Sequence, residues 1–177
     1  LFNPKNKTFT HFRNDDRNPH LLASNKVLAL QTDDKSGLWA GMWQGGLSYF
    51  KIKDNQLILV KKYNYLNPND LSSNCVFKIC YCKDAGELWV GNYLTGAYKF
   101  DPVQETFIPF SLPVESQAYN TIRNIFCDSR GDKWFATDYN GLIWYSNSTG
   151  KFKKFTADKN DSSGVCRNSV SVVFEDS

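Results

Sequence analysis

Three tryptophans in this chain stand at the same place in a long internal repeat. A glycine follows each tryptophan by seven residues, and an aromatic residue follows it by eleven. The copies are Trp39, Trp89 and Trp134, then Gly46, Gly96 and Gly141, then Phe50, Phe100 and Tyr145. A repeat of this kind means that the chain is built from copies of one supersecondary unit, each burying its apolar face against its neighbours.

A second element, the triplet Asn-x-Val or Asn-x-Ile, precedes each tryptophan and marks where a unit begins. Its copies are spaced by 49, 46 and 48 residues, and they begin at Asn25, Asn74, Asn120 and Asn168. Residues 1–12 match residues 99–110 at a constant offset of 98. We therefore expect complete units at 25–73, 74–119 and 120–167, with partial units at 1–24 and 168–177.

The content of one unit is clearest in residues 120–167. Apolar and aromatic residues form four short runs, at 122–127, 133–137, 142–145 and 152–156, which predict four strands. Asp, Ser, Asn and Gly fill 128–132 and 147–150, which predicts turns. Four short strands per unit are typical of a propeller blade. The expected fold is all-β: a partial β-propeller of four-stranded antiparallel blades, with about three blades and a partial blade at both ends.

The repeated residues have expected structural roles. The aromatic anchors Trp39, Trp89 and Trp134 are interpreted as core residues that fill the wedge between neighbouring blades. The glycines Gly46, Gly96 and Gly141 are expected to have positive φ or a close backbone contact where the second strand turns into the third. Closed propellers have about four to eight blades, so we expect the natural chain to continue on both sides.

Charge and cysteine content argue against several function classes. The formal net charge of +3 is well short of a concentrated basic patch, so no nucleic acid partner is expected. No run approaches the roughly 18 apolar residues that span a bilayer, so no membrane contact is expected.

Five cysteines show no metal spacing, and no catalytic or cofactor motif is present; we expect no metal, no cofactors and no catalytic residues. Cys80 and Cys82 share one face of a predicted strand and are interpreted as buried apolar residues. The acidic pair Asp33-Asp34 is interpreted as a solvated turn.

One face of the propeller is the candidate ligand-binding surface. Because antiparallel strands alternate in direction, the loops between strands two and three open on the same face as the loops between blades. The first loop set is rich in aromatic and amide side chains, which suit the apolar faces and hydroxyls of a sugar. The candidate ligand-binding residues are Trp43, Gln44, Tyr93, Asp138, Tyr139 and Asn140. The alternative is that these aromatics only fill the rim, and that the triplet asparagines only shape turns.

The repeated pattern resembles the two-component regulator propeller repeat. The segment 120–137 carries it, as do Leu88-Trp89-Val90-Gly91 and Leu38-Trp39-Ala40-Gly41, with Asp101-Pro102 and Asn3-Pro4 at the turn after the third strand. The resemblance covers essentially the whole chain. The chain departs from the pattern at Ala97, where leucine is usual, and at Lys133 before Trp134.

The resemblance implies a periplasmic sensor region of a hybrid histidine kinase from a Bacteroides-type bacterium. Such a region is the extracytoplasmic part of an inner-membrane protein, and it binds an oligosaccharide ligand without catalysing a reaction. The implied partners are the remaining blades and the signalling domains of the same chain, together with a second copy in a homodimer. Two other functions stay open: a protein-interaction scaffold, and part of a carbohydrate-active propeller enzyme.

Overall fold

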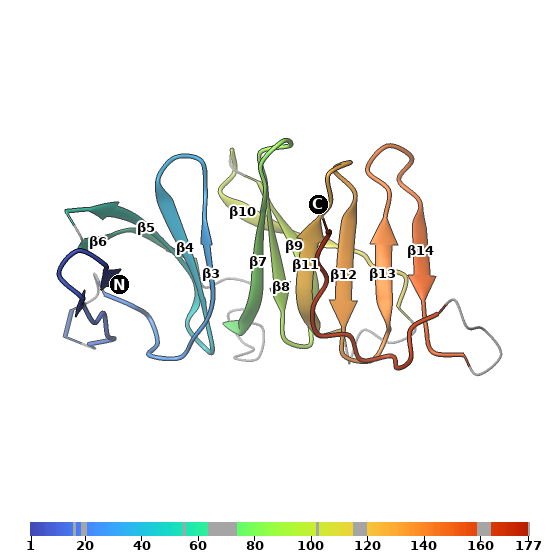
Figure 1. The fold of residues 1–177 in the computed structure, drawn as a ribbon, viewed down its shortest axis with the longest axis horizontal. Helices are drawn as coiled ribbons and strands as arrows, with labels where there is room; N and C mark the ends of the chain where they lie inside the picture. The colour runs from blue at the N-terminus through green and yellow to red at the C-terminus, as the bar shows by residue number, and fades with distance from the viewer. Residues whose placement is uncertain are drawn as a thin grey trace.

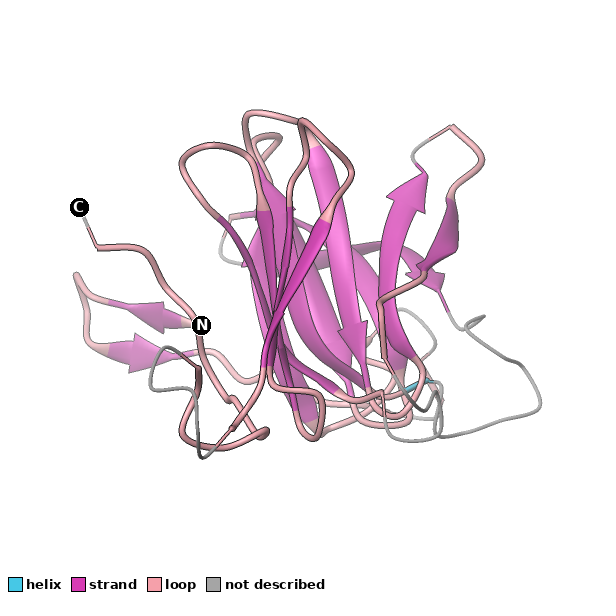
Figure 2. Ribbon diagram, turned by 90° about the vertical axis from the view of Figure 1, so that its right-hand side faces the viewer, coloured by secondary structure: helices cyan, strands magenta, loops and turns pink. Residues whose placement is uncertain are grey.

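The computed structural model describes residues 1–15, 17–18, 21–54, 56–63, 74–101, 103–114, 120–158 and 164–176. Within these ranges the named elements are all strands, and they form three four-stranded antiparallel sheets and one two-stranded hairpin (Figures 1 and 2). The sheets do not close into a ring (Figure 1). The chain is therefore an all-β, partial β-propeller, as the repeat predicts. None of the described residues belongs to a helix long and apolar enough to cross a membrane.

Each sheet follows the chain order of its four strands, so each is one blade. Blade one contains β3 (Val27–Thr32), β4 (Gly37–Met42), β5 (Gly46–Lys53) and β6 (Gln56–Tyr63). Blade two contains β7 (Val76–Cys82), β8 (Glu87–Asn92), β9 (Gly96–Asp101) and β10 (Thr106–Phe110). Blade three contains β11 (Ile122–Cys127), β12 (Lys133–Thr137), β13 (Leu142–Tyr145) and β14 (Phe152–Phe155). The four strands predicted for this last unit are confirmed, with the fourth one residue shorter than expected.

The hairpin of β1 (Phe2–Asn3) and β2 (Thr8–Phe9) repeats the turn between β9 and β10. In both turns the first acidic or amide side chain accepts a hydrogen bond from the backbone N–H two residues later, at 3.0 Å from Asn3 and 2.8 Å from Asp101. Lys7 and Glu105, again 98 residues apart, both have positive φ, at 56° and 53°. The structure thus confirms the offset of 98, while Pro102 itself lies outside the described residues.

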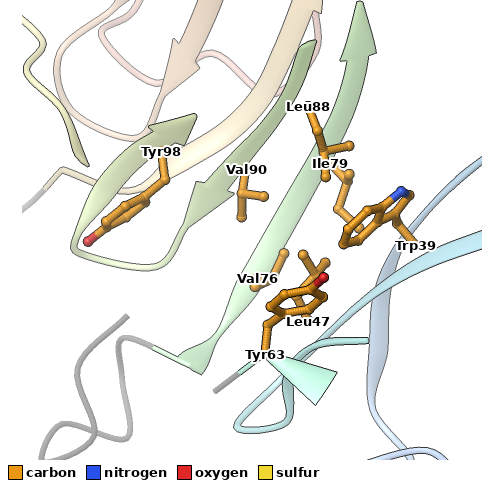
Figure 3. Packing of buried hydrophobic residues seen from close by; sticks show 8 residues of the cluster. All are labelled: Trp39, Leu47, Tyr63, Val76, Ile79, Leu88, Val90 and Tyr98. Carbon is orange, nitrogen blue, oxygen red and sulfur yellow. The ribbon is translucent and has the colours of Figure 1, made fainter. Parts of the chain in front are cut away.

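The hydrophobic core lies between blades rather than within one. Figure 3 shows the cluster between blades one and two, where Trp39 and Leu47 from blade one meet Ile79 and Val90 from blade two. A second cluster joins blades two and three, and a third lies on the other face of blade one, where Phe12 packs against it. Successive residues of a strand point to opposite faces, so blade one contributes to the first and third clusters and blade two to the first and second, while blade three contributes to the second.

The tryptophan anchors occupy this core to different extents. Trp39 is 6% exposed and lies 5.4 Å from the ring of Phe100 in blade two. Trp89 is 2% exposed and lies 5.9 Å from Phe135 in blade three. Trp134 is half-buried. In the described part of the chain its ring contacts, Trp144 and Phe155, belong to its own blade. The predicted core role is confirmed for the two tryptophans that have a following blade to pack against.

The glycine anchors have the predicted backbone conformation. Gly46, Gly96 and Gly141 have φ of 63°, 88° and 73°, in the left-handed region that side chains disfavour. Gly96 is also crowded, because a Cβ built there would lie 2.6 Å from Nδ2 of Asn120 at the start of blade three. The repeat therefore selects glycine for the turn and for the approach of the next blade.

A buried ion pair joins blades two and three. Lys133 is fully buried, and its Nζ lies 3.1 Å from Oε2 of Glu87 in β8. The same ammonium donates to the carbonyl of Gly131 at 2.8 Å and to Oδ1 of Asn147 at 3.2 Å. Glu87 also accepts hydrogen bonds from Lys99 and from the indole of Trp89. Lys133, where the chain departs from the usual repeat, thus forms an ion pair with a carboxylate of the neighbouring blade.

The interpretation of Cys82 as a buried core residue is confirmed, since it is 5% exposed, but it is not a free thiol, and Cys80 is only partly buried. Cys82 of β7 forms a disulfide with Cys127 of β11, with a Cα–Cα distance of 5.8 Å. Cys80 does lie on the same side of β7, because its Sγ is 3.9 Å from that of Cys127. The two partners are 45 residues apart in sequence and on different blades, so no local spacing indicates the bond.

Candidate functional site

The loops that follow each second strand lie against the first residues of the next blade, as expected for two loop sets on one face. The backbone N–H of Leu94 donates to Oγ1 of Thr121 at 3.1 Å, and Thr95 forms a bridge with Asn120. The N–H of Gly141 donates to the carbonyl of Asn168 at 2.8 Å. Residues from neighbouring blades are therefore brought together at this end of the sheets.

One position in each of these loops is structurally equivalent. Its backbone N–H donates to the carbonyl of the middle residue of the Asn-x-Val or Asn-x-Ile triplet in the same blade, at 2.9 to 3.2 Å. The donor and acceptor pairs are Trp43 with Lys26, Tyr93 with Cys75, and Asp138 with Thr121. These bonds fix the direction in which each loop leaves its second strand.

A β-bulge follows the triplet in every blade. The register of β3, β7 and β11 against the second strand shifts by one residue directly after the triplet valine or isoleucine. The residues left without a cross-strand partner at these shifts are Leu28, Phe77 and Arg123. A bulge redirects a side chain out of the regular alternation. The side chains of the bulge residues therefore do not follow the alternating pattern by which neighbouring side chains point into the blade cores.

The loop and bulge residues of the three blades meet in one aromatic cluster. The rings of Trp43, Phe77 and Tyr93 lie near one another, with centroid distances of 5.9 Å for Trp43–Phe77, 5.4 Å for Trp43–Tyr93 and 5.5 Å for Phe77–Tyr93. The guanidinium carbon of Arg123 lies 5.2 Å from the Phe77 centroid, as in a cation–π contact. We call these four residues, together with Asp138, the aromatic surface.

An ion pair borders the aromatic surface. Nε of Arg123 donates to Oδ1 of Asp138 at 2.5 Å, and the two side chains are 45% and 14% exposed. The hydrogen bond to Asp138 raises the pKa of Arg123, and partial burial opposes this without cancelling it. The surface therefore combines three rings, a fixed cation with further N–H donors, and a carboxylate acceptor, while its formal charges balance.

The candidate residues do not all join this surface. Trp43, Tyr93 and Asp138 do, whereas Gln44 is an exposed residue with φ of 58° that shapes its turn. Tyr139 is 64% exposed and follows the position equivalent to Trp43 and Tyr93 rather than occupying it. Asn140 is buried, and its N–H donates to Oγ1 of Thr137 at 2.8 Å. Their role as ligand contacts stays a prediction.

Sequence reasoning missed Phe77 and Arg123. Both directly follow the triplet, at the same place as Leu28. The sequence could have indicated this position, because it varies in size and charge while the residue before it is always valine or isoleucine. Without knowledge of the bulge, simple strand alternation gives no reason to place these side chains beside the loop aromatics.

Several other polar residues are structural. Oδ1 of Asn25 accepts a hydrogen bond from the N–H of Asn14, and Oδ1 of Asn168 accepts one from Ala157, in each case eleven residues upstream. These two asparagines hold the segment that enters their blade, which is a structural role, although the bonded groups lie eleven residues upstream rather than in the local turn that was expected. Asp33 accepts hydrogen bonds from the N–H groups of Lys35 and Gly37, which matches its interpretation as a turn residue.

The comparisons with known proteins bear on the fold. No protein-family model matches the chain, and no curated protein sequence matches it. Among solved structures, the extracellular domain of BT3049 from Bacteroides thetaiotaomicron, assigned to a hybrid two component system, has a TM-score of 0.69 and 22% sequence identity. The match covers 86% of this chain and 20% of that domain, so the chain spans about a fifth of its relative.

Two further structures share the architecture. PorZ of Porphyromonas gingivalis, a surface component of the type-IX secretion system, matches 77% of this chain and 20% of its own with a TM-score of 0.53 and 22% identity. The computationally designed protein Ika4 matches 96% of this chain and 89% of its own with a TM-score of 0.54 and 10% identity. At these identities the likeness is one of fold: the chain has a propeller-blade architecture like that of the matching part of the extracellular domain of BT3049.

Proposed function

We propose that this chain is the ligand-sensing propeller portion of an extracytoplasmic signalling receptor, and that it binds an oligosaccharide on the aromatic surface. The observation that carries the proposal is the convergence of Trp43, Phe77 and Tyr93 with the Arg123–Asp138 pair across three blades. The likeness to the extracellular BT3049 domain and the resemblance to the two-component regulator propeller repeat support the same proposal.

The chemistry of the surface suits a sugar. Aromatic faces bury apolar C–H groups, and a few well-placed polar groups set the orientation of a ligand. Arg123 has donors beyond the Nε that binds Asp138, and the carboxylate of Asp138 retains acceptor capacity. Adjacent hydroxyls of a sugar ring are both donors and acceptors, so a donor beside an acceptor is a complementary pair. In this proposal the surface recognises its ligand and catalyses no reaction.

Signalling would follow from binding rather than from chemistry. A ligand changes the balance between two receptor states only through a difference in affinity for them. The aromatic surface is made of side chains from three blades, so its affinity depends on the angles between blades. A histidine kinase elsewhere in a longer chain, a second receptor copy and a periplasmic location belong to this proposal.

The test is a calorimetric titration of the intact extracytoplasmic region with a panel of neutral and acidic oligosaccharides. Trp43→Ala and Tyr93→Ala should each weaken binding by about thirtyfold, the size of a central contact worth about 2 kcal/mol. Phe152→Ala is the matched control, because the strand register places this exposed ring at the opposite end of blade three from Ile122 and Thr137, which adjoin the surface residues. It should leave the affinity unchanged.

The outcomes separate the alternatives. Binding that is unaffected by Trp43→Ala and Tyr93→Ala would refute the aromatic surface as the site. An absence of binding across the whole panel would refute sugar sensing and favour an interaction scaffold. Turnover of an oligosaccharide would instead favour a carbohydrate-active enzyme.

A further inference from the structure

Three of the five cysteines converge between blades two and three. Cys80 and Cys82 lie on β7, and Cys127 lies on β11; these two strands are neighbours across the blade interface (Figure 1). The three Sγ atoms all lie within 4.8 Å of one another. The remaining two cysteines are placed differently, because Cys75 is buried near the opposite end of β7 and Cys166 is exposed.

The third thiol of this group is in contact with the disulfide. Cys80 is not disulfide-bonded, and its Sγ donates to Sγ of Cys127 at 3.9 Å. Cys80 and Cys82 are two residues apart on one strand, so both point toward β11. A thiol held against a disulfide sulfur is the arrangement from which thiol–disulfide exchange proceeds.

We infer that Cys80, Cys82 and Cys127 form an internal exchange site, in which the Cys82–Cys127 disulfide interconverts with a Cys80–Cys127 disulfide. The Cys80 thiolate attacks Sγ of Cys127, the Cys80–Cys127 bond forms, and the Cys82–Cys127 bond breaks. Cys82 leaves as a thiolate and takes up a proton equivalent to the one that Cys80 released. One disulfide and one thiol are present before and after, so the step needs no oxidant or reductant.

The movement required is small. A disulfide bond is about 2.0 Å long, so the Cys80 sulfur must approach Cys127 by about 1.9 Å from its present 3.9 Å. Rotation about the Cα–Cβ bond of a cysteine moves its sulfur by more than this. The attacking sulfur must also lie in line with the bond that breaks, whereas the Sγ atoms of Cys80 and Cys82 are within 4.8 Å of each other. Exchange therefore needs the Cys80 and Cys82 side chains to rotate so that the Cys80 sulfur both approaches Cys127 and moves into line.

The exchange has a chemical consequence at a cavity. A cavity of about 710 Å³ between the turns of blades two and three is lined by Cys82 and Cys127, together with Lys83 and Arg130. Cys80 is not among its lining residues. Exchange therefore moves the cross-link along β7, away from the turn, and leaves a free Cys82 thiol at the wall of this cavity, whose other lining residues include both cations and carboxylates.

The environment of Cys80 sets the rate. Burial raises the pKa of the Cys80 thiol, opposed by a hydrogen bond with the backbone of Cys127 and by the positive charges of Lys78 and Lys133. Because the thiolate is the attacking species, exchange is slow at neutral pH and faster in mildly alkaline solution.

The test is disulfide mapping of the full-length protein by mass spectrometry. The protein is incubated at low concentration in mildly alkaline buffer without reductant, free thiols are trapped by alkylation in acid, and the chain is cleaved after Tyr81 with chymotrypsin. Cleavage there separates Cys80 from Cys82. We expect two Cys127 cross-links, one to each cysteine, with alkylation on the one left free.

Variants make the result specific. Cys82→Ser should retain a cross-link, now between Cys80 and Cys127, and Cys80→Ser should show the Cys82–Cys127 cross-link alone. Cys166→Ser is the control for exchange between molecules and should leave the ratio of the two cross-links unchanged. The wild-type measurement decides the question even where a variant fails to fold.

Each contrary result overturns the inference. A single Cys82–Cys127 cross-link in the wild-type protein after incubation refutes exchange, even where Cys82→Ser can form the other bond. A folded Cys82→Ser protein in which Cys80 and Cys127 are both alkylated refutes it as well. A ratio that changes in Cys166→Ser assigns the exchange to contact between molecules.

Discussion

The buried pair of Lys133 and Glu87 makes a prediction about the cohesion of blades two and three. Glu87→Gln removes the negative charge and leaves a fully buried ammonium with neutral acceptors, Gly131 and Asn147 among them. Removing one member of a buried ion pair costs about 3 to 5 kcal/mol of unfolding free energy. We expect the lower end, about 3 kcal/mol, because the Glu87 side chain is 18% exposed and the Gln oxygen still accepts a hydrogen bond.

The opposite substitution should cost less. Lys133→Met removes the buried charge itself and keeps the aliphatic stem in the core, while Glu87 retains Lys99 and the Trp89 indole as donors. The expected cost is about 1 to 2 kcal/mol, from the acceptors that lose a donor. The double variant should cost less than the sum of the two single variants, by about 1 to 3 kcal/mol, because the two charges interact directly.

Urea unfolding of the propeller region, followed by tryptophan fluorescence, measures these free energies. Lys99→Met is the matched control, because Lys99 also binds Glu87 but its side chain is 44% exposed. An exposed pair of this kind contributes at most about 1 kcal/mol. The reasoning is refuted if Glu87→Gln costs no more than Lys99→Met, or if the costs of Glu87→Gln and Lys133→Met simply add.

The same pair predicts a dependence on pH. Burial raises the pKa of Glu87, but hydrogen bonds from Lys99, Lys133 and Trp89 outweigh it, so the pKa lies below its usual value of 4.5. A carboxyl whose pKa is lowered on folding stabilises the fold above the unfolded value, and this contribution is lost as the pH falls through the folded value. The acid loss of stability should therefore be shallower in Glu87→Gln than in the wild-type protein.

Three further predictions concern the repeated glycine, the repeated tryptophan and the phenol of Tyr49. Gly96→Ala should lower the unfolding free energy by about 2 to 4 kcal/mol, because it combines an unfavourable φ with a steric clash. Gly131→Ala, with φ of 81° and open space around it, should lower the unfolding free energy by only about 1 kcal/mol. Equal melting temperatures of the two variants would contradict this. Trp89→Ala should cost about 3 to 5 kcal/mol and Trp134→Ala clearly less, because only the first is fully buried; the reverse order in urea unfolding would count against the blade-core assignment. Burial and a hydrogen bond with an aspartate raise the pKa of Tyr49 to about 12, so its contribution to stability is present below pH 10 and lost toward pH 12; Tyr49→Phe should reduce this alkaline loss.

The blade architecture was predictable because the repeat records it directly. Trp134 lies within β12, and Gly141, directly before β13, has positive φ, so the strand bounds in blade three follow almost residue by residue from the repeat. The match of residues 1–12 with 99–110 agrees with the positive φ that Lys7 and Glu105 share in the structure.

Contacts between blades were beyond the reach of sequence patterns. The Cys82–Cys127 bond and the Lys133–Glu87 pair join residues 45 and 46 positions apart, where periodicity within one strand carries no information. Arg123 was missed for another reason: a one-residue bulge changes which way its side chain points, and alternation counted from the triplet cannot show this. The candidate surface was therefore found through its loop residues, and two of its five residues, Phe77 and Arg123, came from the structure.

The bulge after each triplet has a consequence for how such a propeller diversifies. The side chain of the bulge residue does not pack into the core between blades. Leu28, Phe77 and Arg123 therefore differ in size and charge, while the residue before each of them is always valine or isoleucine. Blades two and three thus each contribute one interchangeable position, Phe77 and Arg123, to the aromatic surface, and Leu28 occupies the equivalent position in blade one. Duplication of blades followed by substitution at these positions would change what the surface recognises in single-residue steps, and the same positions are where a designed change of specificity would begin.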